Sequence, residues 1–481
     1  MSGVASKAAP LGSINNPVKF KDQDFEKLKA ECLASGTLFE DPIFPAEQAS
    51  MGFKKYGPNS EKVKEIVWKR ASELKENPVF IIDGAEREDI RQGGLLDCWL
   101  LASVACLTLN QDCLFRVVPP NQSFDKDYAG IFYFKFWQYG QWMEVVVDDM
   151  LPTKNGQLTA AKSNASHEFW CPLLEKAYAK INGSYEALDG GHALESLVDF
   201  TGGVGETYET AKPPADLFQR VKRTLIEKSL TASSTVSYYN MNRPQRQKFV
   251  DDVGETIDEM NIVAGHMYSI TGAEEVTCDG KVVQIIRLRN PWGKTEWNGP
   301  FSDGSPEWDK VDPDVKAKLN VQNEDGETWM PLEEYKNRFK VLEICNIHLS
   351  EVCCGDDFNW SLTEFNGSWQ KDISDGGKKG LDRFSTNPQY RIQLKAKDGD
   401  ATKKRTLVVS LTQKDRRKQK AANPKLWWKL GQTDVGKKGT TEGARWNDEV
   451  KFETRIRVNK IRDKGQELPE KKDKTQNESG S

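Results

Sequence analysis

The chain has 481 residues, of which 37% are apolar and 29% charged, so it is globular in composition and too long for one ordinary domain. Its net charge of −4 gives no indication of a nucleic-acid partner, although residues 401–481 are basic and the preceding part is acidic. Nine cysteines, an odd number without a C-x-x-C pair, argue against a disulfide scaffold and a zinc ribbon. We therefore expect a reducing, cytoplasmic location.

The N-terminal part has no continuous apolar run of the kind found in secretion signals, and position 2 is not glycine. Residues 22–34 have helical spacing of apolar side chains and precede a turn-rich stretch at 40–46. We interpret residues 1–45 as an N-terminal anchor segment. The most apolar stretch, 95–109, is shorter than the roughly 20 residues that a membrane span needs, so it predicts a buried helix.

The following residues predict two lobes. A helix at 98–109, a hairpin of 131–137 and 142–147 turning at Tyr139-Gly140, and a helix at 168–181 form an α+β lobe over residues 46–199. Short β-prone runs at 234–239, 265–271 and 282–289 predict a second lobe over residues 200–348.

The C-terminal part differs in composition from both lobes. Trp360, Trp369 and the runs 390–394 and 406–411 indicate strands of an all-β module over residues 349–462. Residues 463–481 are charged and end in Gly and Ser, which is typical of a disordered tail.

Cys98 is the first candidate for chemistry, because it stands where a loop containing Gly93, Gly94 and Asp97 meets the apolar helix. The partial positive charge of a helix N-terminus favours thiolate over thiol and so favours nucleophilicity. The alternative is an inert buried cysteine, which is our interpretation of Cys106. Cys98 needs partners before it can be assigned a role.

His266 and Asn290 are the candidate partners. His266 begins the run 265–271, a turn is expected at Thr271-Gly272, and the run 282–289 ends just before Asn290. If the two runs pair as antiparallel strands, His266 and Asn290 lie at the same sheet edge, where the amide could orient the imidazole toward a thiol. Taken singly, His266 could be an ordinary polar residue and Asn290 a turn residue.

Three segments now carry a resemblance to a known family: QGGLLDCWLLA (92–102), GHMYSITGA (265–273) and RNPWG (289–293). They resemble the catalytic blocks of the calpain protease core, and FWCPLLEKAYAKIN (169–182) is similar too. The resemblance implies an α+β fold, namely a papain-like core in two lobes followed by an all-β C2-like sandwich domain. It further implies a calcium-activated cysteine endopeptidase that makes limited cuts in protein substrates.

The resemblance also assigns roles to matching positions. Gln92 would donate its amide to the oxyanion of the tetrahedral intermediate, as would the Cys98 backbone N–H. Trp292 would shield the His266–Asn290 pair, and Gly191 and Gly265 would bind the substrate backbone. The family usually has Gly where this chain has Leu96, so we expect a strained loop if that position needs a positive φ.

Calcium is the cofactor that the resemblance implies. The first-lobe ligands would be Ile82, Gly84, Asp89 and Glu168, and the second-lobe ligands would be Glu296, Asp303, Asn323, Asp325 and Glu327. Such a mixture of carboxylates and carbonyls suits an ion that takes about 6–8 oxygens. Arg87 and Glu327 would pair across the lobes once both sites fill.

The C-terminal resemblance covers NPQY (387–390) and the basic run 411–420, which suggests an anionic membrane surface as a candidate partner. No penta-EF-hand pattern is found, so we do not expect a small regulatory subunit. Two other functions stay open at this point. One is a catalytically silent scaffold or lipid-binding protein, and the other is a transglutaminase-type acyl transferase, which would normally have Asp in place of Asn290.

Overall fold

The computed structural model divides the chain into two compact units, Met1–Cys353 and Cys354–Ser481. It describes residues 9–82, 84–236, 249–250, 255–320, 325–347, 360–370, 373–374, 376, 381–390, 407–414, 417–418 and 449–459. No helix within those ranges combines the length and the apolar character that crossing a membrane requires.

The N-terminal segment is fixed to the first unit by short elements. β1 (Val18–Lys19) pairs in parallel with β4 (Gln141–Asp148), and η1 (Phe20–Asp22) leads to α1 (Phe25–Ser35). The Asp24 side chain caps α1 by accepting from Lys27 N at 3.0 Å, and Gly36 ends the helix with φ 68°. The helix expected at 22–34 is therefore present, shifted by a few residues.

The expected hairpin is formed by β3 (Ile131–Gln138) and β4, which pair antiparallel in the three-stranded sheet β1-β4-β3. Tyr139 and Gly140 connect the strands with φ values of 49° and 96°, the left-handed conformation that tight hairpin turns need. A second small sheet has the order β2-β5-β6, made of β2 (Val67–Arg70), β5 (Met150–Lys154) and β6 (Gln157–Leu158).

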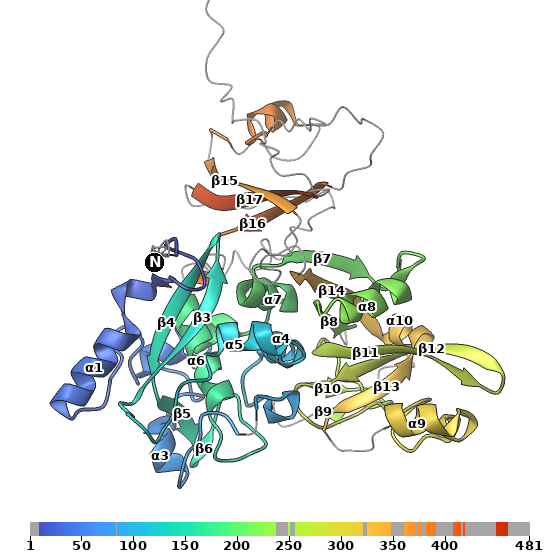
Figure 1. Cartoon of the computed structure of the whole chain (residues 1–481), viewed down its shortest axis with the longest axis horizontal. Helices are drawn as coiled ribbons and strands as arrows, with labels where there is room; N and C mark the ends of the chain where they lie inside the picture. The colour runs from blue at the N-terminus through green and yellow to red at the C-terminus, as the bar shows by residue number, and fades with distance from the viewer. Residues whose placement is uncertain are drawn as a thin grey trace, which may run out of the picture. The chain divides into compact units, whose positions relative to one another are not determined.

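Two long helices belong to the first lobe (Figure 1), the first at the side that meets the second lobe and the second in the middle of the first lobe. α4 (Cys98–Thr108) is buried at every position after Cys98, as its mostly apolar sequence predicts. α6 (Trp170–Asn182) is likewise buried over nearly its whole length and ends at Gly183. The other helices here are α2 (Gln48–Met51), α3 (Ala71–Leu74), η2 (Arg87–Asp89), α5 (Gln111–Val117), η3 (Tyr185–Leu188) and α7 (Ala193–Thr201).

The second lobe is built on a six-stranded sheet with the order β13-β12-β11-β8-β14-β7. Its members are β7 (Val204–Glu209), β8 (Leu230–Thr235), β11 (Met267–Cys278), β12 (Lys281–Arg289), β13 (Glu327–Pro331) and β14 (Phe339–Asn346). All the neighbouring pairs are antiparallel. Of the strand predicted at 234–239, the structure describes residues up to 236, and there β8 ends at Thr235.

The turn predicted at Thr271-Gly272 is wrong. β11 passes through these residues with a bulge between Ile270 and Gly272 and continues to Cys278. The chain reverses instead at Asp279-Gly280, where φ values of 49° and 71° supply the left-handed backbone of a tight hairpin. The expected pairing survives, because Ser269 still faces Arg289.

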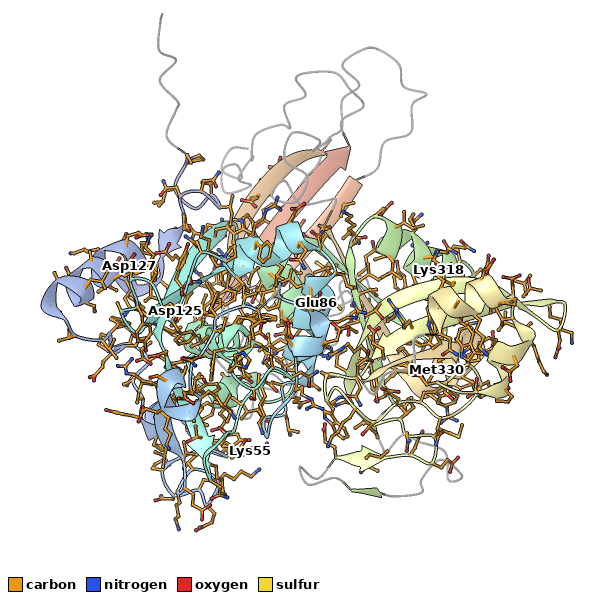
Figure 2. All side chains as sticks on the ribbon, turned by 60° about the horizontal axis from the view of Figure 1, so that its bottom comes forward. Lys55, Glu86, Asp125, Asp127, Lys318 and Met330 are labelled. Atoms are coloured by element: carbon orange, nitrogen blue, oxygen red, sulfur yellow. The ribbon has the colours of Figure 1, made fainter. Side chains whose placement is uncertain are left out.

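Helices and short strands complete the second lobe. They are α8 (Leu217–Ile226), β9 (Phe249–Val250), β10 (Thr256–Ile257), η6 (Pro306–Lys310), α9 (Pro313–Leu319) and α10 (Leu332–Arg338). Figure 2 shows the side chains, with Asp125 and Lys318 exposed and Met330 of β13 fully buried in the second-lobe core.

The second unit contains a three-stranded antiparallel sheet of order β15-β17-β16. Its strands are β15 (Trp360–Gln370), β16 (Leu407–Gln413) and β17 (Glu449–Asn459), and η9 (Asp382–Thr386) lies between the first two in sequence. β15 and β16 match the predicted strands. Residues 391–394, part of the basic run 411–420 and the tail 463–481 lie outside the described residues.

Candidate active site

Cys98 is the first residue of α4 and is partly exposed, whereas the residues that follow it are buried. The carbonyl of Asp97 starts the helix by accepting from Leu100 N at 2.8 Å and from Leu101 N at 3.2 Å. The thiol therefore lies at the positive end of a buried helix, as the sequence predicts.

His266 stands directly before β11 and is fully buried. Its Nε2 lies 3.0 Å from Asn290 Oδ1, so the expected base and orienting amide are adjacent. Asn290 is itself fixed, because its Nδ2 donates to Thr295 O at 3.1 Å and its Oδ1 also accepts from Trp292 N at 3.0 Å. An Oδ1 acceptor places a proton on Nε2 and leaves Nδ1 to face the thiol.

The charge state of His266 is set by its neighbours. Burial disfavours the imidazolium, but the interaction with Cys98 and then that with Glu255 raise the pKa of His266 to about 10. Glu255 Oε1 lies 3.3 Å from Nδ1. A proton leaving the Cys98 thiol would thus find a favourable position on the imidazole.

Trp292 covers the imidazole. The two ring centroids are 5.2 Å apart at an interplanar angle of 63°, an edge-to-face contact. Tyr268 contacts the imidazole as well, with centroids 5.4 Å apart at 83°. The position of Trp292 agrees with the shielding role that the resemblance implies.

The loop before Cys98 carries Gln92. Its Nε2 donates to Leu95 O at 2.7 Å, and its backbone N–H donates to Pro291 O at 2.9 Å, which joins this loop to the segment after Asn290. Gly93 allows the close approach of Ala160, since a Cβ at residue 93 would lie 2.0 Å from that carbonyl oxygen. The amide of Gln92 carries a second N–H that an oxyanion could accept.

Leu96 does not strain this loop. It is not among the described residues with positive φ, and its carbonyl accepts from Gly190 N at 2.8 Å. A side chain is therefore compatible with the backbone, and the strain expected from the Gly-to-Leu departure is not found. Gly191 follows on the same segment, and Gly265 has φ 67° beside His266.

Asp97, directly before the nucleophile, is fully buried and lies against the buried carboxyl group of Glu175. Burial raises the pKa of Asp97 to about 6. Burial and the neighbouring Asp97 raise the pKa of Glu175 well above its usual range. Two buried carboxyl groups that lie close together are expected to share a proton.

In the first lobe the structure brings Glu168 to the predicted calcium loop. Its Oε1 accepts from Ile82 N at 2.8 Å and its Oε2 accepts from Ser163 Oγ at 2.7 Å. Burial raises the pKa of Glu168 to about 7, and the nearby Asp89 acts in the same direction. Gly84, with φ 108°, allows the loop to turn. A buried carboxylate, Glu168, beside a half-buried one, Asp89, fits a cation site.

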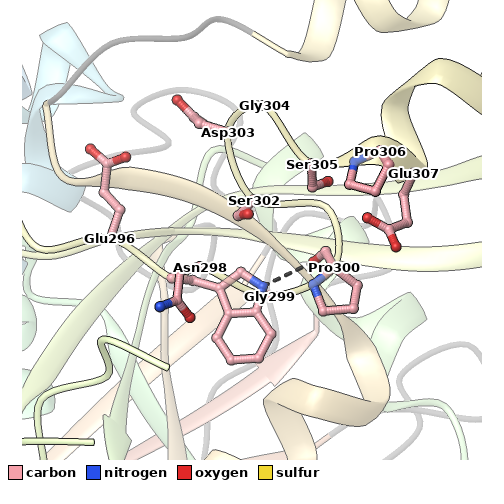
Figure 3. Close-up of a pocket in the computed structure, with 11 residues that line it drawn as sticks. Glu296, Asn298, Gly299, Pro300, Ser302, Asp303, Gly304, Ser305, Pro306 and Glu307 are labelled. Carbon is pink, nitrogen blue, oxygen red and sulfur yellow. Dashed lines mark hydrogen bonds between the residues drawn. The ribbon is translucent and has the colours of Figure 1, made fainter. Parts of the chain in front are cut away.

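In the second lobe Glu296 and Asp303 line a cavity of ≈ 460 Å³ formed by the loop 296–307, and both carboxylates point to the same side (Figure 3). Glu296 Oε1 also accepts from Gly326 N at 2.8 Å, which links the cavity to Asp325. Asn323 lies outside the described residues. Over the described ranges no three His, Cys, Asp or Glu side chains form a ready metal cluster.

Arg87 and Glu327, the expected pair between the lobes, are in contact. Arg87 Nε donates to Glu327 Oε1 at 2.8 Å and Nη2 donates to Oε2 at 3.3 Å. The fully buried Arg289, which neighbours Asn290, donates to Ile90 O at 3.0 Å and makes a further link between the lobes. The contact is present, whereas its response to calcium stays a prediction.

Glu255 is a residue that sequence reasoning missed. It stands eleven residues before His266 in the chain, with β10 between them, and no spacing rule connects the two. A second missed contact joins His192 Nδ1 to Glu343 Oε1 at 2.9 Å, between the loop after Gly191 and β14. The only local feature is that Glu255 directly precedes β10 and that Glu343 lies within β14.

A partly exposed thiol at a helix N-terminus, facing an imidazole that a carboxamide orients, defines the class of papain-like cysteine proteases. The family described as calpain family cysteine protease matches residues 39–346, so the chain belongs to the calpain family. Domain III of the calpain large subunit matches residues 365–432, which identifies a C2-like β-sandwich domain after the protease core.

The chain is similar to several curated calpains. Calpain-8 of Mus musculus is 47% identical over 419 residues, which cover 86% of this chain and 58% of that protein. The calpain-2 catalytic subunits of Mus musculus and Homo sapiens are each 46% identical over 431 residues, covering 87% of this chain and 60% of theirs. The chain thus spans about 60% of the length of these relatives.

Proposed function

We propose that the chain is a calcium-activated cysteine endopeptidase that cleaves protein substrates. The observation that carries the proposal is the contact of His266 with Asn290 on one side and with Cys98 on the other. The matching family and the name of one relative, the catalytic subunit of calpain-2, support it. A silent scaffold would not need this buried arrangement, and Asn290 stands where a transglutaminase-type acyl transferase would normally have Asp.

The reaction follows from the arrangement of the side chains. Cys98 transfers its proton to His266 Nδ1, and the thiolate attacks the carbonyl carbon of the scissile peptide bond. The oxyanion accepts hydrogen bonds from the Cys98 backbone N–H and the Gln92 amide, a donor being worth about 3–4 kcal/mol. His266 then protonates the leaving amine, which gives a thioester, and a water molecule hydrolyses this ester with His266 as base.

The substrate would bind as an extended segment whose backbone pairs with Gly191 and Gly265. Two positions support this: Gly191 follows Gly190, whose N donates to Leu96 O in the loop before Cys98, and Gly265 stands directly before His266. Recognition through the backbone accepts many side chains, which fits limited cuts in exposed segments of proteins.

The proposed calcium ligands are the Ile82 and Gly84 carbonyls with Asp89 and Glu168, and a second set comprising Glu296, Asp303, Asn323, Asp325 and Glu327. Bound calcium would supply the free energy that favours the form with the two lobes joined by Arg87 and Glu327. The raised pKa values of Glu168 and Asp89, caused mainly by burial, support a first-lobe cation site.

We also propose that the protein is cytoplasmic and that it contacts an anionic membrane surface. The thiols of Cys32, Cys98, Cys106, Cys171 and Cys278 form no disulfide within the described residues, which is compatible with a reducing compartment. The basic run 411–420 is the candidate membrane contact, and vesicle binding with and without anionic lipid would test it.

A peptidase assay with and without calcium, on the wild type and on Cys98→Ala, tests the proposal. We expect calcium-dependent hydrolysis by the wild type and none by the variant. A silent wild type in saturating calcium would favour a scaffold. Incorporation of an amine without hydrolysis would favour an acyl transferase.

A further inference from the structure

Glu255 is an acidic side chain at the catalytic imidazole that the proposed mechanism does not use. Its Oε1 lies 3.3 Å from His266 Nδ1, and the two side chains are 12% and 0% exposed. The contact is on Nδ1, the nitrogen that exchanges a proton with Cys98, and not on Nε2, which Asn290 occupies. The carboxylate therefore faces the proton that moves during catalysis.

The charges around the imidazole come from few groups. Cys98 on α4 and Glu255 before β10 are the charged neighbours that stabilise its protonated form. The imidazole also contacts an amide and two aromatic rings, which belong to Asn290, Trp292 and Tyr268. Glu255 also influences Asp97, so its charge extends to the residue before the nucleophile.

We propose that Glu255 is a positioning residue for catalysis, whose carboxylate stabilises the imidazolium form of His266 and holds its Nδ1–H beside Cys98. This inference rests on the proposed function. A buried imidazole would otherwise lose its proton readily, because burial opposes the charge. With Glu255 in contact, the thiolate–imidazolium pair persists to higher pH, and the proton needed by the leaving amine remains available.

The role has a defined signature in pH dependence. An opposite charge within about 4–6 Å raises the pKa of an imidazole by 1 unit or more. Glu255→Gln keeps the shape and removes the charge, so the alkaline limb of kcat/KM should move down by about 1 pH unit. Glu255→Asp keeps the charge and should restore most of the alkaline limb. Glu259→Gln, an exposed acid four residues away, is the matched control and should leave the limb unchanged.

A second measurement separates this inference from the proposed function. The sample is the calcium-loaded full chain with Cys98→Ala, a variant that cannot cleave itself. The pKa of the His266 imidazole is measured by an NMR titration. A further variant, His266→Ala, identifies the His266 resonance. Adding Glu255→Gln should lower the imidazole pKa by about 1 unit, whereas Glu259→Gln should not. Unfolding temperatures of the variants check that the fold is kept.

The outcomes are distinct. An unchanged imidazole pKa in the Glu255→Gln variant would overturn the inference, whether or not the wild type cleaves peptides. A lowered imidazole pKa in a protein without peptidase activity would support the contact and reject the proposed function. A higher kcat with an unshifted alkaline limb would also count against us, since it would mean that Glu255 competes with Cys98 for the Nδ1 proton.

Discussion

Arg87 and Glu327 are 240 residues apart in sequence and form a two-point ion pair between the lobes, with N–O distances of 2.8 and 3.3 Å. The side chains are 27% and 9% exposed, so the pair is only partly screened by water. Two parallel hydrogen bonds between a guanidinium and a carboxylate fix direction as well as distance. This geometry favours one relative placement of the lobes.

Arg87→Ala should therefore raise the calcium concentration that gives half-maximal peptidase activity. Losing a charge-assisted contact of about 1.4 kcal/mol corresponds to roughly a tenfold rise. The measurement is a calcium titration of activity, with Arg220→Ala as control because Arg220 pairs with Asp216 on the surface. An unchanged titration in Arg87→Ala would show that the pair does not couple to calcium.

Glu168 predicts a pH effect on calcium binding. Burial raises its pKa to about 7, so below that pH the carboxyl is largely protonated and a cation must displace the proton. Calcium affinity should rise with pH between about 6 and 8, with proton release on binding. Calorimetry in buffers of different ionisation enthalpy measures this release. Glu168→Gln should reduce this proton release, whereas Glu61→Gln should not, because the Glu61 side chain is 83% exposed and pairs with Lys64 on the surface. Equal release in both variants would contradict the assignment.

Gln92→Ala should lower kcat by about 100-fold with little change in KM, because an oxyanion donor acts in the transition state rather than on bound substrate. Steady-state kinetics on a peptide substrate separate the two parameters. Gln284→Ala, on the exposed part of β12, is the control. A rise in KM at constant kcat would instead assign Gln92 to substrate binding, or to holding the loop through Leu95.

The Asp97–Glu175 pair predicts a fall in stability with rising pH. The native state holds their proton more tightly than the unfolded state, so unfolding becomes easier as pH rises from about 4 through the raised pKa values. Glu175→Gln supplies an N–H in place of the shared proton and should flatten this dependence. Thermal unfolding at several pH values measures this dependence. Glu333→Gln is the control, because the Glu333 side chain is 81% exposed. Parallel curves for wild type and Glu175→Gln would refute the shared proton.

The main elements could be predicted because their signals are local. The mostly apolar run after Cys98 favours burial, and Tyr139-Gly140 between two β-prone runs indicates a hairpin. The adjacency of His266 and Asn290 followed from pairing two neighbouring strands, which constrains their ends even when the turn is misplaced. That misplacement arose because a bulge at Ile270 looks like a turn in sequence.

The remaining contacts could not be predicted from local signals. The contact between Glu255 and His266 depends on how the chain around β10 folds back, and the contact between Arg87 and Glu327 depends on how the two lobes pack. Nothing in the spacing of these residues encodes such distances. Resemblance to a family supplied the second pair, and only the structure supplied the first.

The hydrogen bond from Gln92 N to Pro291 O has a consequence for the proposed calcium switch. It ties the segment that carries the oxyanion donor to the segment that carries the orienting amide. In the proposed switch, a separation of the two lobes would break this hydrogen bond and would move Cys98 away from His266 at the same time. A molecule with separated lobes would then have no residual hydrolytic activity. The total activity would depend on the fraction of molecules whose lobes are joined, and not on a graded change in the rate of each molecule.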